Sequence, residues 1–132
     1  MSWLVFTILS VMLIIFYKRI KPVEGLKFID AEILCEIKKN QNVKILDIRD
    51  PMDFEKSHVP GAINIYVGRL PYVSKKEFDI NDVIIIVSSS EYHIKKAART
   101  LMKSGFYNFA GSLWIENEKR NCEEGRQHEL CF

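Results

Sequence analysis

The sequence has no marked excess of charge of either sign. Its 132 residues include 19 lysines and arginines against 17 aspartates and glutamates, so the formal net charge is only +2. A nucleic-acid-binding protein concentrates positive charge, and this balance gives no support for that class. We therefore expect no nucleic acid among its partners. The sequence also contains no internal repeat.

Cysteine is scarce, and its placement argues against two kinds of small domain. The three cysteines are Cys35, Cys122 and Cys131, an odd number without the spacing of metal ligands. The sequence therefore predicts no metal site, no cofactor and no disulfide framework. We expect three free thiols with structural or incidental roles, which a cytoplasmic location would keep reduced.

Charged side chains are absent from residues 1–17, MSWLVFTILSVMLIIFY, whereas the rest is ordinary soluble sequence. As a helix this run reaches roughly 25 Å, slightly short of a hydrocarbon core of roughly 30 Å, and snorkelling end residues would close the difference. We expect a transmembrane anchor at residues 1–19. A buried core helix fits poorly, because the run is apolar all round.

A cleaved signal peptide is the main alternative for this run. However, no basic region precedes Trp3 and no small-x-small cleavage pattern precedes Lys18. The residues just after the run are basic: Lys18, Arg19, Lys21 and Lys27. The positive-inside rule then predicts a single-pass membrane protein with its C-terminal domain in the cytoplasm. These cations would also hold the start of the domain near an anionic leaflet.

The remaining sequence divides into a linker at 20–26, one domain at 27–116 and a polar tail at 117–132. Periodicity predicts helices at 31–39, 52–57 and 92–104, the last ending at Gly105. It predicts strands at 43–48, 62–65, 83–87 and 106–110, and a loop containing Gly68, Pro71, Lys75 and Lys76. The β-branched run at 83–87 is typical of a central parallel strand. The predicted fold class is therefore α/β, a parallel β-sheet flanked by helices.

Several short motifs in this order resemble the rhodanese-like (sulfurtransferase) family over about residues 27–115. The front half matches in LDIRD at 46–50 and in HVPGAINI at 58–65, and the back half in KSGF at 103–106 and in the 111–114 ending. The resemblance implies a set of scaffold residues: Asp47, Arg49, Asp50, Phe54, His58, Pro60, Gly61, Ala62 and Gly105. We expect Asp47 and Arg49 to be structural partners, and His58 to fix the turn by hydrogen bonding.

Family enzymes carry a cysteine at the end of the strand that 83–87 resembles, inside a loop of backbone N–H groups at a helix N-terminus. Such a loop stabilises a thiolate and then a persulfide anion, which carries the transferred sulfur. Counting back from Gly105–Phe106 and from Ala97–Ala98 without a gap, the resemblance puts Ser88 at this position. Serine is hardly ionised near neutral pH and forms no stable persulfide, so we expect no catalytic residue here.

The residues after Ser88 keep the length of the family loop but change its chemistry. The vestigial loop would comprise Ser88, Ser89, Ser90, Glu91, Tyr92 and His93, with Glu91 where glycine is common and His93 where arginine is common. A carboxylate there would oppose an anionic donor such as thiosulfate. The simplest interpretation of the serines is helix capping, with Glu91 in the first turn. The alternative is a loop that still binds a small anion or a segment of a partner protein.

Three functions remain open from the sequence. The first is a catalytically inactive binding or regulatory module, tethered to the membrane beside a protein partner. The second is a sulfurtransferase that uses another cysteine, and the third is a structural component of an oligomer. Phosphatase activity, known from relatives of the fold, is not expected because it needs the same missing cysteine.

Overall fold

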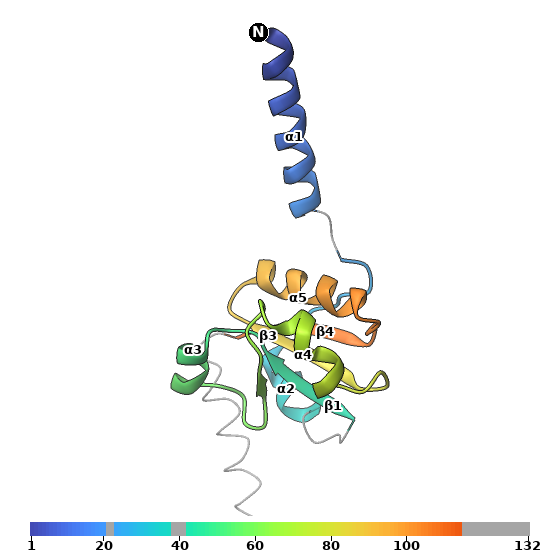
Figure 1. Ribbon diagram of the computed structural model, residues 1–132. Coiled ribbons are helices and arrows are strands. Elements are labelled where there is room, and N and C mark those ends of the chain that lie inside the picture. Colours follow the sequence, from blue (N-terminus) through green and yellow to red (C-terminus); the bar gives the residue numbers. More distant parts are fainter. Residues whose placement is uncertain (21–22, 38–41, 115–132) are drawn as a thin grey trace, which may run out of the picture.

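The computed structural model describes residues 1–20, 23–37 and 42–114, and Figure 1 shows a long N-terminal helix above an α/β unit. The helices are α1 (Ser2–Ile20), α2 (Ala31–Ile37), α3 (Pro51–Lys56), α4 (Leu70–Glu77) and α5 (Glu91–Lys103). The strands are β1 (Val43–Asp47), β2 (Ile63–Asn64), β3 (Val83–Ser88) and β4 (Phe109–Leu113). The predicted polar tail and its two cysteines lie outside the described residues.

The four strands form one parallel sheet in the order β2-β1-β3-β4. β3 is central, as its β-branched run predicts, and five of its six residues are buried. Register places Asp47 beside Asn64 on one side and beside Val87 on the other. The carboxyl ends of β1, β2 and β3 therefore meet at one edge of the sheet.

Two apolar clusters pack on opposite faces of this sheet. One holds Ile84 and Ile86 of β3 against α4 and α5, whose inward residues Leu70, Ile94 and Leu101 are fully buried. The other holds Ile85 and Val87 against Leu34 of α2, together with Val59 and Trp114. This alternation follows from the period of two along a strand, and it makes a three-layer α/β unit.

The N-terminal helix α1 is separate from this core. All its residues are exposed, none is buried, and its mean hydropathy of 1.8 and its 19 residues suffice to cross a membrane. The helix includes Lys18 and Arg19 and ends at Ile20, one residue beyond the predicted anchor at 1–19. The folded unit then begins at Val23, which lies in the segment expected to be a linker and is buried in the α4–α5 cluster.

The predicted loop around Gly68 and Pro71 is wrong, because residues 70–77 form helix α4. Pro71 lies in the first turn, where its missing N–H costs no hydrogen bond and its fixed φ suits a helix. Leu70 and Ser74 are buried on the side that packs against α5. Proline often indicates a loop, but in the first turn of a helix it favours the helix.

The strand predicted at 106–110 is also misplaced, because β4 covers Phe109–Leu113. Phe106 is buried in the core without belonging to the strand, and its ring packs edge-on against Phe78 at a centroid distance of 6.4 Å. Its apolar side chain therefore reflects burial rather than strand pairing. The other elements lie within about two residues of their predicted ends, with residues 38–39 of the first predicted helix outside the described residues.

Helix α5 ends as predicted. Gly105 follows it with a φ of +93°, in the left-handed region that glycine adopts without a steric penalty. Backbone N–H groups of Gly105 and Phe106 donate to the carbonyls of Met102 and Leu101, which closes the last turn. This termination lets the chain reverse into β4.

Candidate functional site

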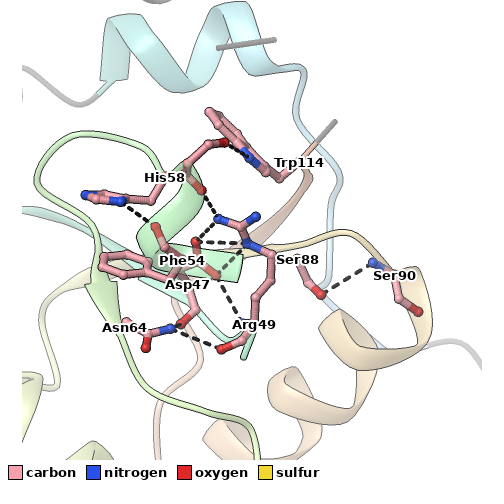
Figure 2. A network of polar contacts seen from close by, with 9 residues as sticks. Asp47, Arg49, Phe54, His58, Asn64, Ser88, Ser90 and Trp114 are labelled. Atoms are coloured by element: carbon pink, nitrogen blue, oxygen red, sulfur yellow. Dashed lines mark hydrogen bonds and ion pairs between the residues drawn. The ribbon is translucent and has the colours of Figure 1, made fainter. Parts of the chain in front are cut away.

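Polar residues gather at the carboxyl edge of the sheet, where β1, β2 and β3 end (Figure 2). Ligand sites of parallel α/β sheets lie at this edge, because the loops that leave the strands converge there. Asp47 ends β1, Asn64 ends β2 and Ser88 ends β3. These residues are the starting point for the site.

Asp47 and Arg49 form a buried ion pair at this edge. The Asp47 side chain is fully buried, and the Arg49 side chain is only 9% exposed. Arg49 Nη2 lies 2.8 Å from Asp47 Oδ2, and Arg49 Nε lies 3.0 Å from Asp47 Oδ1. The Arg49 backbone N–H also donates to Oδ1 at 3.0 Å. The guanidinium is thus held in one orientation by a two-point contact.

The Arg49 fork links β1 to the residues that follow α3. Its Nη2 also donates to the Ser57 carbonyl at 2.6 Å. From β2, Asn64 Nδ2 donates to the backbone carbonyls of Asp47 and Arg49, both at 3.1 Å. The sequence motifs did not assign these roles to Ser57 and Asn64. The sequence did offer one signal for Asn64. Asparagine is uncommon in strands, so an asparagine at a strand position indicates that its side-chain amide makes a specific hydrogen bond.

His58 contacts the last turn of α3 through its imidazole ring. Its Nδ1 lies 2.6 Å from the Phe54 carbonyl oxygen and therefore donates to it. The imidazole also stacks on the Phe54 ring, with centroids 3.9 Å apart and planes at 15°. Gly61 follows with a φ of +83°, a backbone conformation that is sterically unfavourable for residues with a side chain. Pro60 and the partly buried Ala62 flank this glycine. At the start of α3, the Asp50 carboxylate accepts a hydrogen bond from the Met52 N–H at 2.9 Å.

Ser88 is buried at the end of β3, with 2% of its surface exposed. Its Oγ accepts the backbone N–H of Ser90 at 3.3 Å (Figure 2). Ser90 occupies the N-cap position of α5, but its own side chain makes no capping hydrogen bond. The capping interpretation is therefore wrong for the Ser90 side chain. The hydroxyl at the strand end instead receives the N–H of the turn.

The three residues after the serines lie on the surface at the start of α5. Glu91 is in the first helical turn, where its charge suits the helix dipole, and it lies 3.9 Å from Lys95. Tyr92 and His93 are exposed, with ring centroids 5.5 Å apart. None of these three side chains lines the pocket beside the strand ends.

A pocket of about 300 Å³ opens beside Arg49 and Ser89, the residue that follows the end of β3. It is lined by Arg49, Asp53, Lys56, Ser57, Ser89 and Trp114. Trp114 Nε1 donates to Ser57 Oγ at 3.3 Å, and the Arg49 guanidinium lies 5.8 Å from the Trp114 ring centroid. The wall is thus preorganised, with Lys56 and Asp53 supplying opposite charges. The sequence did not indicate Asp53 or Lys56, because a pocket wall has no motif of its own.

The side chains at this edge supply hydrogen-bonding and charged groups. Among residues 1–20, 23–37 and 42–114, no group of three His, Cys, Asp or Glu residues is arranged to hold a metal ion. Cys35 belongs to α2, whereas Cys122 and Cys131 lie outside the described residues. The pocket wall carries the guanidinium of Arg49, the ammonium of Lys56, the carboxylate of Asp53 and the hydroxyls of Ser57 and Ser89.

Comparison with known families gives a match over most of the folded unit. A family model described as a rhodanese-like domain matches residues 30–113. This span includes every strand and all the residues of the carboxyl-edge site except Trp114, which lies one position beyond it.

One curated relative is YrkF of Bacillus subtilis (strain 168), a proposed sulfur carrier protein. It is 34% identical over 71 residues, which cover 54% of this chain and 38% of YrkF. The chain therefore spans little more than a third of that relative. Most of the length of YrkF has no counterpart in the matched region.

Solved structures show the same fold at low identity. The Alr3790 protein from Anabaena sp. has a TM-score of 0.63 at 18% identity, covering 70% of this chain and 85% of that one. The single-domain sulfurtransferase RDL2 of Saccharomyces cerevisiae has a TM-score of 0.62 at 16% identity, covering 76% and 94%. The parallel sheet with its flanking helices is therefore an arrangement that these proteins share.

Proposed function

The chain belongs to the rhodanese-like family, and from this premise we propose that it is a membrane-tethered binding module that does not transfer sulfur. The family includes sulfur carriers and sulfurtransferases. The observation that carries the proposal is the Ser88 hydroxyl at the carboxyl end of the central strand. By its spacing from the Gly105–Phe106 motif, we infer that this residue stands where the family enzymes have their nucleophilic cysteine.

The environment of Ser88 supports the proposal that this residue does not act as a nucleophile. A serine nucleophile needs a neighbouring base, because its hydroxyl is hardly ionised near neutral pH. His58, one of two histidines in the described part of the chain, donates Nδ1–H to Phe54 and stacks on its ring. The contact that Ser88 Oγ does make is with a backbone N–H, which cannot accept its proton. Oxygen also cannot carry sulfane sulfur as a stable persulfide.

The preserved scaffold supports a binding role. The buried Asp47–Arg49 pair, the Asn64 bridges and the Trp114–Ser57 contact all hold the wall of the pocket in place. Preorganised walls lower the cost of ordering groups when a ligand binds. We propose that the pocket binds a small polar ligand, either an oxyanion beside Lys56 and Ser89 or a polar segment of a protein partner.

Tethering is the second part of the proposal. Helix α1 would be about 28 Å long by its residue count, close to a hydrocarbon core of about 30 Å. None of its residues is buried and its apolar side chains are exposed, so we propose that a membrane covers them. A membrane also raises the local concentration of partners anchored beside the domain.

The test is a sulfurtransferase assay of the chain beside its Ser88→Cys variant, with folding followed by circular dichroism. We expect the unchanged chain to be inactive. In the variant, the new thiolate would attack the outer sulfur of thiosulfate and release sulfite. The resulting persulfide would give its sulfur to cyanide, which forms thiocyanate and restores the thiolate.

The matched control is Ser89→Cys, which places a thiol one residue further on, at an exposed position. Gain of activity in Ser88→Cys alone would support loss of the nucleophile within an intact site. Two folded but inactive cysteine variants would favour binding of a protein segment over an anion. Activity in the unchanged chain that disappears on replacing Cys35, Cys122 or Cys131 would overturn the proposal in favour of a sulfurtransferase with another nucleophile.

A further inference from the structure

Helix α5 presents a basic outer face beside the end of α1. We propose that this face docks on an anionic phospholipid leaflet and holds the domain against the membrane. The inference rests on the proposed tethering by α1 and adds the orientation of the domain. It concerns a surface on the opposite side of the sheet from α2.

The end of α1 is in contact with the start of α5. The Arg19 guanidinium carbon lies 4.9 Å from the centroid of the Tyr92 ring, within the range of a cation–π interaction. Figure 1 shows α5 crossing below the lower end of α1, while α4, the sheet and α2 lie farther away. Tyrosine and arginine side by side just beyond an apolar span are typical of a membrane–water interface.

The outer face of α5 is strongly basic. The helix has four basic residues and one acidic residue, Glu91. Its basic residues are Lys95, Lys96, Arg99 and Lys103. The inward side is apolar and buried, so the helical period directs these cations away from the core. Lys96 and Lys103 are exposed, whereas Lys95 is partly neutralised by Glu91 at 3.9 Å.

Charge is concentrated here although the chain as a whole is nearly neutral. With Lys18 and Arg19 of α1, this region holds six of the 19 basic residues and one of the 17 acidic ones. Attraction to anionic headgroups decays within a Debye length of about 8–10 Å, so it acts only on cations held near the surface. The Arg19–Tyr92 contact places α5 at the end of the span and so favours a leaflet as the partner.

Docking through α5 leaves the pocket accessible. The pocket is lined by residues of α3 and of the turns that follow β1, α3, β3 and β4, and none belongs to α4 or α5. A domain held by the outer face of α5 would therefore contact the lipid through residues other than those that line the pocket. The orientation is compatible with a soluble ligand or a protein partner reaching the carboxyl edge of the sheet.

The test uses the full chain in lipid nanodiscs that carry a gadolinium-chelate lipid, with relaxation enhancement measured at backbone amides by NMR. Discs of phosphatidylcholine alone are compared with discs containing about one third phosphatidylglycerol. We expect the amides of α5 to show at least about twofold greater enhancement in the anionic discs, because electrostatic attraction brings them closer to the headgroups. The amides of α2 should not change in this way.

Two charge variants make the test specific. Lys96→Gln with Lys103→Gln removes two exposed cations from the outer face, and Lys75→Gln with Lys76→Gln removes two exposed cations from α4. We expect the first pair to abolish the anionic-lipid effect and the second pair to retain it. Equal enhancement in both kinds of disc, or an effect that survives the first pair, would overturn the inference and favour an acidic protein as the partner of this face.

Co-elution of the chain with the discs separates this inference from the proposal that it rests on. A chain that co-elutes while α5 is insensitive to lipid charge contradicts docking alone. A chain that does not co-elute contradicts both tethering and docking. Neither result depends on the sulfurtransferase assay.

Discussion

Asp47 illustrates how much of this domain depends on one buried carboxylate. It is fully buried, accepts from the side chain and the backbone N–H of Arg49, and sits in register with β2 and β3. A buried guanidinium without its partner is costly, because its desolvation is no longer offset. The geometry of the pair therefore stabilises the fold independently of any ligand.

Replacing Asp47 by Asn should strongly destabilise the domain. The amide removes the negative charge and turns an N–H₂ group toward the Arg49 donors, and loss of one partner of a buried pair costs about 3–5 kcal/mol. Urea unfolding of the chain from residue 21 onward, followed by circular dichroism, measures the change. The matched control is Asp50→Asn, where asparagine caps a helix about as well as aspartate. Equal stability of both variants would contradict this account of the pair.

At the scale of elements, the fit between α5 and β4 depends on the absence of a side chain at Gly111. A methyl group added there would lie 2.7 Å from Ile94 Cγ2 and 3.3 Å from the Phe28 ring. Phe28 pairs with Gly111 in an isolated parallel bridge, so the chain before α2 also packs over this position. Close approach of helix and strand thus requires glycine at this point.

The variant Gly111→Ala should lower the free energy of unfolding by about 1–3 kcal/mol, the usual cost of overpacking a core. Ile94→Ala removes the atom that clashes, so the double variant should lose less stability than the two single variants together. Gly68→Ala is the control, because its added methyl would meet only the exposed ring of Tyr66. Strict additivity of Gly111→Ala and Ile94→Ala in urea unfolding would argue against the contact.

At the scale of the whole molecule, α1 and the folded unit differ in whether their apolar side chains are buried. The unit has its own two apolar clusters, whereas α1 buries no residue. Basic residues lie in the last turn of α1, and the positive-inside rule associates such residues with the cytoplasm. These features set the expected topology.

A reporter fused after Phe132 should be membrane-bound and cytoplasmic. Protease added to intact cells should leave it uncut, and protease added after the membrane is opened should remove it. The mass of the membrane-bound chain should include residues 1–20, which separates an anchor from a cleaved signal peptide. Cleavage of the reporter from outside intact cells would reverse the proposed orientation.

The sequence by itself determined the class of this protein. The apolar run at the N-terminus, the β-branched strand at 83–87, the amphipathic helix ended by Gly105 and the motifs at 46–50 and 58–65 were sufficient for an α/β rhodanese-like unit behind a helix long enough to span a membrane. These signals are local, since each depends on periodicity or on residues a few positions apart. The prediction was wrong at Pro71, because a proline in the first turn favours a helix rather than a loop. It was wrong at Phe106, because this side chain is buried in the core without belonging to a strand.

Only the tertiary structure decided how the site is assembled and which way it faces. Strand register joined Asp47 to Asn64, and Ser57 and Trp114 met across 57 positions of the chain. The pocket walls and the contact between Arg19 and Tyr92 likewise unite residues from distant segments. No local pattern encodes such contacts, because they arise from packing two layers of helices on one sheet.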